Sequence, residues 1–171
     1  MLFIVCGLDK VDQVIAERRP SHMITLLDPA SMIETPAGFA PDRHLRLGLN
    51  DIAEPIDGMV LPGEDAVARI LAFGRSWNET APMLIHCWAG ISRSTASAFT
   101  LACERSPDAD ERAIAMAMRR AAPHAHPNRR IVALADDMLG RRGRMVDAVD
   151  AMGGDGYVTF GTPFDFAARH R

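Results

Sequence analysis

The chain has 171 residues, of which 48% are hydrophobic and 24% are charged, and its formal net charge is −3 at pH 7. This length can bury a sizeable core, and this balance is typical of a globular protein rather than a disordered one. The slightly negative charge argues against a nucleic-acid partner, although arginines outnumber acidic residues between Arg119 and Arg144.

The first half of the chain alternates short apolar runs with helical patterns. Asp9 is expected to cap a helix, and residues 62–65, Pro-Gly-Glu-Asp, begin a second helix that continues to Trp77. Residues 30–43 contain prolines and a glycine, which predict a loop with no more than a short helical turn. The apolar runs that predict strands are 2–6, 23–27, 44–49 and 83–87. This alternation predicts an α/β fold with a central, largely parallel sheet of about four to five strands and helices on both faces.

Helical patterns dominate the second half of the chain. Residues 94–105 form the first predicted helix there, and Asp108 with Glu111 is expected to make a capping box for the next. Asn128 opens a third predicted helix, which ends at Gly140.

One domain is expected over residues 1–171. A glycine-rich break predicts an irregular tail over 152–171, whose aromatic side chains, that of Tyr157 included, are expected to dock on the rest of the domain. The uncharged apolar stretches are only strand-length, so no membrane partner is expected. The first residues lack the basic flank and the length of a signal peptide, which favours a cytoplasmic location.

A cysteine, and an arginine six residues after it, follow the apolar run 83–85. Residues 86–94 read His-Cys-Trp-Ala-Gly-Ile-Ser-Arg-Ser, so a strand ending near Cys87 meets a helix beginning near Ser94. The backbone N–H groups of such a loop and the helix dipole can converge on one anion. Arg93 can bind two phosphate oxygens at once, and a thiol in these surroundings can react as a thiolate. The pattern therefore predicts a phosphate-binding loop with a nucleophilic cysteine.

This motif resembles the signature His-Cys-x5-Arg-Ser/Thr of the cysteine-dependent protein tyrosine phosphatases, most closely their compact dual-specificity-like branch. The resemblance implies that His86 shapes the loop and that Cys87 forms a phospho-enzyme. It also implies that Arg93 binds the phosphate and that the Ser94 hydroxyl stabilises the thiolate as it leaves. Gly90 fits the same picture, because it allows a bend that a side chain would block.

A phosphate ester also needs a proton donor, because an unprotonated alkoxide or phenoxide leaves slowly. Asp51 is the predicted general acid, since it follows the strand 44–49 and precedes Cys87 by 36 residues. The resemblance implies an acid from a loop at this place in the chain order. Asp57 and Asp65 are its rivals, although they are typical of a turn and of a first helical turn.

The loop residues between the cysteine and the arginine carry no charge, whereas a site for multiply phosphorylated inositols would benefit from additional cations. Trp88 and Ile91 either offer apolar surface to an aromatic ring or turn inward to the core. Phosphotyrosine is therefore the favoured substrate, and a phosphorylated protein or small molecule is the expected partner. The predicted substrate-binding residues are Trp88, Ala89, Gly90, Ile91, Ser92 and Arg93.

Other functions are compatible with parts of the same pattern. A phosphoinositide or small-metabolite phosphatase would use the same loop. A rhodanese-like sulfurtransferase also has a reactive cysteine in a strand-to-helix loop, but it does not need the hydroxyl of Ser94 or an upstream acid. A phospho-residue-binding module without turnover usually lacks the nucleophile or the acid, whereas this chain has Cys87, Arg93 and Asp51.

The remaining cysteines and histidines predict no metal or other cofactor. Cys6 and Cys103 are expected to be buried, and the odd number of cysteines fits a reducing compartment. His124 and His126 lie two residues apart without nearby carboxylate or thiolate ligands, which makes a poor metal site. By resemblance, His126 and Asn128 lie in a loop near the active site, where they could reach the edge of the pocket.

Overall fold

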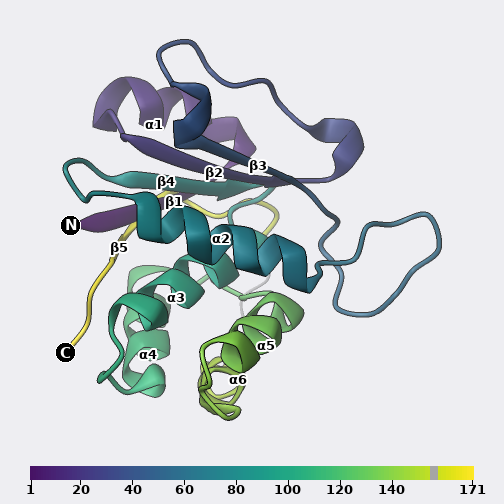
Figure 1. The fold of residues 1–171 in the computed structure, drawn as a ribbon, viewed down its shortest axis with the longest axis vertical. Helices are drawn as coiled ribbons and strands as arrows, with labels where there is room; N and C mark the ends of the chain where they lie inside the picture. The colour runs from purple at the N-terminus through teal and green to yellow at the C-terminus, as the bar shows by residue number, and fades with distance from the viewer. Residues whose placement is uncertain (155–157) are drawn as a thin grey trace.

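The computed structural model describes residues 1–154 and 158–171. Its centre is a five-stranded sheet in the order β3-β2-β4-β1-β5 (Figure 1). The first four strands in the chain are mutually parallel, and only β5 runs antiparallel, against β1. The strands are β1 (Leu2–Gly7), β2 (His22–Leu27), β3 (His44–Gly48), β4 (Met83–Cys87) and β5 (Phe164–Ala167).

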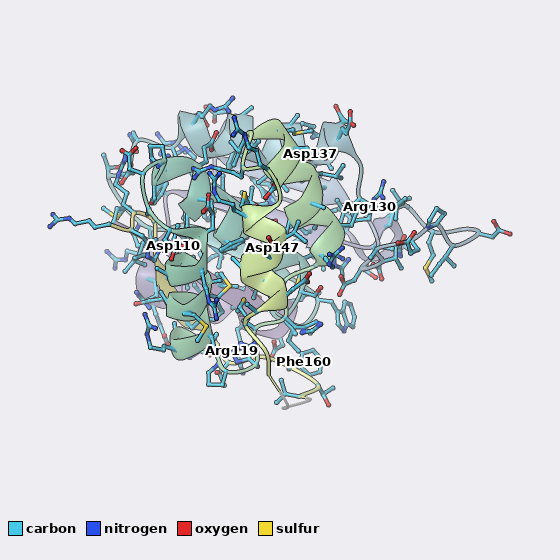
Figure 2. The ribbon with its side chains drawn as sticks, turned by 90° about the horizontal axis from the view of Figure 1, so that it is seen from below. Asp110, Arg119, Arg130, Asp137, Asp147 and Phe160 are labelled. Carbon is cyan, nitrogen blue, oxygen red and sulfur yellow. The ribbon has the colours of Figure 1, made fainter. Side chains whose placement is uncertain are left out.

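In the described part of the chain, six helices cover the two faces of the sheet unequally. On one face lies α1, and on the other face α2 and α3 pack against the strands, with α4, α5 and α6 further out (Figure 1). Figure 2 shows these outer helices from below, with Asp110 and Arg119 at opposite ends of α4. The predicted α/β architecture with a largely parallel sheet is confirmed. The helices are α1 (Val11–Arg18), α2 (Glu64–Ser76), α3 (Arg93–Arg105), α4 (Glu111–Ala121), α5 (Arg129–Met138) and α6 (Arg144–Asp150).

Each face of the sheet buries its own apolar core. On the α1 face, Val11 and Val14 pack with side chains of β1, β2 and β4. The larger core lies on the other face and includes α3, of which residues 93–103 are all buried. Small side chains on α3 allow the sheet and the outer helices to approach it closely from opposite sides. The loop that precedes α3 is therefore attached to a helix at the centre of the molecule.

Two predicted helix starts are wrong in detail. Asp9 lies in a 3-10 turn, Leu8–Lys10, and α1 begins after it without a side-chain cap. The cap of α4 is Asp110, which accepts a hydrogen bond from the backbone N–H of Arg112, rather than Asp108. Glu111 is drawn away from a capping box because its buried carboxylate pairs with two arginines of the following segments.

The predicted irregular tail over 152–171 is wrong for residues 164–167, which form β5. This strand buries Phe164 and Phe166 on one side and pairs with β1, so these two aromatic side chains dock on the sheet as expected. Phe160 is 46% exposed, so the expectation is wrong for that residue. Tyr157 lies outside the described residues. The sequence interpretation also named no separate helix at 144–150, where α6 forms.

The sheet topology fixes where the functional loops meet. Because β1 to β4 are parallel, the segments that follow Gly7, Leu27, Gly48 and Cys87 all emerge at the same edge of the sheet. Ligands of open parallel sheets bind at this edge. It is also where the long connection between β3 and α2 projects from the body of the protein (Figure 1).

Candidate active site

The loop that follows β4 turns its carbonyl oxygens outward. Four of these oxygens accept hydrogen bonds from backbone N–H groups of other segments. In a trans peptide the following N–H points the opposite way, so the N–H groups of residues 89, 90, 92 and 93 face the inside of the loop. Such converging N–H groups form a nest for an anion. The donor and acceptor pairs are Leu8 to Trp88 (3.0 Å), Gly161 to Ala89 (2.8 Å), His126 to Ile91 (2.9 Å) and Asn128 to Ser92 (3.2 Å).

Gly90 is required at the tightest point of this loop. Its φ of +72° lies in the left-handed region that glycine adopts without strain. A Cβ there would also lie 2.6 Å from the carbonyl carbon of Cys6 and from the backbone nitrogen of Gly7. The predicted bend at Gly90 is confirmed, and the structure adds a close backbone contact with the end of β1.

Cys87 ends β4 and is 2% exposed. Its Sγ lies 3.1 Å from the Oγ of Ser94, which is the second residue of α3. A hydroxyl at this distance can donate a hydrogen bond to a thiolate and stabilise its negative charge. The side chains of Cys87 and Ser94 therefore lie as the predicted roles require.

Arg93 is held in place on one edge and open on the other. Its Nη1 donates to the Oδ1 of Asp28 at 2.8 Å and to the carbonyl oxygen of Leu49 at 2.7 Å. Its Nε is buried and has no hydrogen-bond partner among the described residues. Leaving a buried guanidinium N–H unpaired is costly, so an anionic ligand at this edge would satisfy it.

Asp51 faces the same loop from the connection between β3 and α2. Its Oδ1 accepts a hydrogen bond from the Oγ of Ser92 at 2.8 Å and another from the Nδ2 of Asn128 at 2.9 Å. The other carboxylate oxygen makes no hydrogen bond within the described part of the chain. Two donors on one oxygen orient the carboxyl group and leave the second oxygen for a substrate.

One cavity of about 510 Å³ brings these side chains together. Cys87, Arg93 and Asp51 all line it, as do Trp88 and Ile91. The sequence left open whether these two residues face the site or the core. Both line the cavity, where Trp88 is 48% exposed and Ile91 is half-buried. The remaining lining residues are Asp28, Ser31, Asn50, Ile52, Met59, Ala89, Ser92, Val158 and Thr159.

The rival acids do not line this cavity. Asp57 is exposed in a turn, and Asp65 lies in the first turn of α2. His124 and His126 line an adjacent cavity of about 460 Å³ that shares Asp51 with the first. Burial and the charge of Arg119 lower the pKa of His124.

The other cysteines belong to the core. Cys6 and Cys103 are fully buried, and burial raises the pKa of Cys6 to about 12 and raises that of Cys103 as well. In residues 1–154 and 158–171 no group of three or more His, Cys, Asp or Glu side chains is placed to hold a metal ion. Within the same ranges, no helix is both long enough and apolar enough to cross a membrane.

Sequence reasoning missed two kinds of supporting residue. Asp28, which holds Arg93, directly follows β2, and its position at the carboxyl end of a predicted parallel strand could have signalled it. The partners of Asp51 gave no such signal, because Ser92 was assigned to substrate and Asn128 lies 77 residues away in the chain. Of the two residues expected at the pocket edge, Asn128 bonds to Asp51 but does not itself line the cavity, and His126 lines the adjacent cavity instead.

Comparison with solved structures identifies the fold. The structure superposes on the crystal structure of DUSP15 with a TM-score of 0.59 and 18% sequence identity, over 89% of this chain and 92% of that chain. It superposes on PTP-2 phosphatase of Cydia pomonella with a TM-score of 0.57 and 19% identity, over 78% and 83% of the two chains. No protein-family model matches the sequence, and no curated protein matches it either. The chain thus has the fold of the dual-specificity and protein tyrosine phosphatases.

Proposed function

We propose that this chain, with its phosphatase fold, is a phosphoric monoester hydrolase that works through a cysteinyl-phosphate intermediate. The observation that carries the proposal is the shared cavity: a nucleophile, an arginine with an unpaired buried N–H and a carboxyl group surround one nest of backbone N–H groups. A phosphate is the anion that this arrangement fits, because it offers acceptors to the nest and to the guanidinium together.

In the first step, Sγ of Cys87 attacks phosphorus while the bond from phosphorus to the ester oxygen breaks. Arg93 and the inward N–H groups hold the remaining phosphate oxygens and neutralise the charge that develops on them. Asp51 gives its proton to the leaving oxygen, so the product departs as an alcohol or a phenol.

In the second step, water attacks the cysteinyl phosphate. Asp51, now ionised, accepts a proton from this water, and the bond between sulfur and phosphorus breaks. The hydroxyl of Ser94, 3.1 Å from Sγ, stabilises the departing thiolate. Inorganic phosphate then leaves the nest, and no cofactor is needed by these steps.

Phosphotyrosine is the substrate that the cavity favours. Its walls include exposed apolar side chains of Met59, Trp88 and Val158, which suit an aromatic ring. Among the described residues, Arg93 is the one cation that lines this cavity, and one edge of its guanidinium is already paired with Asp28. A multiply phosphorylated inositol would need more positive charge next to the bound phosphate.

The nucleophile is tested by Cys87→Ser with an aryl phosphate as substrate. We expect a folded protein with no measurable phosphate release, because a hydroxyl replaces the thiolate. Circular dichroism checks the fold, and tungstate or phosphate titration checks that the nest still binds an oxyanion. Substantial turnover by a correctly folded variant would refute the cysteine mechanism, and turnover of thiosulfate instead of phosphate esters by the wild type would favour a sulfurtransferase.

The substrate class is tested by measuring phosphate release from phosphotyrosine peptides, phosphoserine peptides and soluble phosphoinositides under one set of conditions. We expect kcat/KM for phosphotyrosine peptides to exceed that for phosphoinositides by at least about tenfold, which corresponds to about 1.4 kcal/mol in transition-state free energy. Equal or reversed efficiencies would identify a lipid or small-metabolite phosphatase instead. Binding of phosphotyrosine without any turnover would identify a phospho-residue-binding module.

A further inference from the structure

A buried chain of hydrogen bonds leads from a surface segment to the first peptide of the active-site loop. It begins at Thr35, whose Oγ1 lies 2.9 Å from Nδ1 of His44. Nε2 of His44 and Nε2 of His86 each lie 2.7 Å from the same hydroxyl, that of Thr25. Nδ1 of His86 lies 3.4 Å from the carbonyl oxygen of Cys87. The chain thus crosses three neighbouring strands, β3, β2 and β4, inside the protein.

The proton positions along this chain follow from its last member. A carbonyl oxygen can only accept, so His86 must carry its proton on Nδ1 to bond with Cys87. In a neutral ring Nε2 then accepts, and the hydroxyl of Thr25 must donate to it. Since Thr25 has one proton to give, His44 must donate from Nε2 to the Thr25 oxygen. Nδ1 of His44 is then an acceptor, and Thr35 donates to it.

The opposite direction would require a charged imidazole. If Thr25 donated to His44 instead, His86 would have to donate from both ring nitrogens and carry a positive charge. His86 is fully buried, and burial is the main reason that its pKa is lowered to about 4. Burial also lowers the pKa of His44 to about 4, with a smaller contribution from Arg46. Both rings are therefore neutral near pH 7, and a single direction remains.

The last hydrogen bond of this series, from His86 to the Cys87 carbonyl, affects the geometry of the loop. The Cys87 carbonyl that His86 binds belongs to the peptide whose N–H is that of Trp88, the first residue of the loop after the cysteine. Holding this carbonyl outward turns that N–H toward the nest, as for the other loop peptides. The ordinary preference of an imidazole for a proton on Nε2 would place a lone pair of Nδ1 against the carbonyl and oppose this orientation.

We propose that Thr35, His44 and Thr25 form a positioning relay that keeps the proton of His86 on Nδ1 and thereby holds the first peptide of the loop in its phosphate-binding orientation. They are positioning residues, because none of them lines the cavity that contains Cys87. Their importance for turnover rests on the proposed phosphatase function, whereas the direction of the hydrogen bonds does not.

The direction is tested without any substrate. In two-bond 1H–15N correlation spectra of protein labelled at histidine, we expect the Nδ1–H form for His86 and the Nε2–H form for His44 at pH 7. Assignment uses the loss of one ring signal set in His44→Gln. The reverse pair of tautomers, or a charged His86 ring at this pH, would overturn the relay, and it would do so even if the protein were an active phosphatase.

The effect on turnover is tested by a matched pair, Thr25→Val and Thr25→Ser. Valine has the shape of threonine without the hydroxyl, and we expect kcat to fall by about tenfold while KM for an aryl phosphate changes little. Serine keeps the hydroxyl, so Thr25→Ser should restore kcat. A valine variant with the kcat of the wild type, or a serine variant as impaired as valine, would contradict the relay.

Thr35→Val provides a second test at the far end, where the side chain is only half-buried and the substitution leaves the core untouched. We expect a smaller fall in kcat, about threefold, together with partial loss of the Nδ1–H signal of His86. An unchanged kcat and an unchanged His86 spectrum in Thr35→Val would remove Thr35 and His44 from the proposal. If neither the wild type nor any variant turns over phosphate esters while the tautomers are as expected, the proposed function is wrong. The direction of the hydrogen bonds is then still supported.

Discussion

The two loops that face each other across the candidate site are built in opposite ways. In the nucleophile loop, residues 87–93, four carbonyl groups accept hydrogen bonds from three separate segments, and the loop sits against the backbone of β1. The acid loop, residues 50–60, carries Asp51 and is by contrast exposed at every residue from 53 to 60. Asn50 and Val60 hold the two ends of this loop together. The N–H of Asn50 donates to the carbonyl oxygen of Val60, and the N–H of Val60 donates to Oδ1 of Asn50, both at 2.8 Å.

The difference assigns distinct tasks to the two loops. A nest that must neutralise a developing charge gains most from dipoles that are already oriented, and the nucleophile loop has this property. A loop with few buried contacts opens at low free energy, and the acid loop has this property. We therefore expect changes in the nucleophile loop to affect the fold and every substrate, and changes in the acid loop to affect turnover selectively.

The largest effect should come from Gly90→Ala. The added methyl group would meet backbone atoms of Cys6 and Gly7 at 2.6 Å, and alanine is strained at a φ of +72°. We expect activity to fall below detection and the melting temperature to fall by several degrees, as measured by phosphate release and circular dichroism. Gly58→Ala is the matched control, since Gly58 has a φ of +78° but open space around its Cβ position. Equal losses in both variants would show that backbone strain, not contact with β1, controls the loop.

The general acid gives the next largest effect. Asp51→Asn should lower turnover of alkyl and ordinary aryl phosphates by about 10²–10⁴, because the leaving oxygen loses its proton donor. The loss should be much smaller for an aryl phosphate whose phenol is acidic enough to leave unprotonated. Asp57→Asn is the matched control on the same loop and should retain activity, because Asp57 does not line the cavity. If Asp57→Asn or Asp65→Asn shows the dependence on leaving group and Asp51→Asn does not, the assignment of the acid is wrong.

The contrast between the loops also explains what the sequence could predict. The nucleophile loop has a local pattern, because Cys87, Gly90 and Arg93 lie within seven residues and their spacing alone implies a strand-to-helix turn. Strands β1 to β4 were equally local, since each is a short run with apolar residues that are continuous or alternate. The position of Asp28 after a predicted strand could place it at the functional edge of the sheet. Its contact with Arg93, like the buried contact between Thr25 and His44, depends on which strands become neighbours.

Two of the errors in the fold have the same cause. The buried carboxylate of Glu111 depends on Arg141 and Arg144 in a distant segment, whereas the cap at Asp110 instead of Asp108 is a local contact with the N–H of Arg112. The tail strand β5 is only four residues long and gains its stability from β1, at the other end of the chain. Local propensity carries no information about either partner.

Asn128 connects the two loops, because its side chain donates to Asp51 and its backbone N–H donates to Ser92. Its substitution should have a moderate effect on turnover. Asn128→Ala removes the hydrogen bonds from Nδ2 to the carboxylate of Asp51 and to the carbonyl oxygen of Ile52. We expect kcat to fall by about tenfold on ordinary substrates, with a much smaller change for an activated aryl phosphate, because the acid is still present but poorly oriented. The Asn128 Oδ1 also caps α5, so Asn128→Asp, which keeps a capping oxygen, separates the two roles. If Asn128→Asp keeps full activity, the tie to Asp51 is not needed for turnover.

The smallest effect concerns pH, and it sharpens the comparison because the nucleophile loop alone is supported by buried neutral histidines. The pKa of His86 and that of His44 are both lowered to about 4, mainly by burial, from an ordinary value of 6.5. Between these values the unfolded chain binds more protons than the folded protein. The free energy of unfolding must therefore fall as the pH is lowered from 6.5 to about 4, and these two groups contribute no further change below that. Replacement of one titrating ring by His44→Gln should flatten the fall in melting temperature across this window, while carboxylates that titrate at lower pH contribute equally to both proteins. Thermal melts of the wild type and of His44→Gln at several pH values measure the difference, and parallel curves would mean that His44 is not buried as a neutral ring.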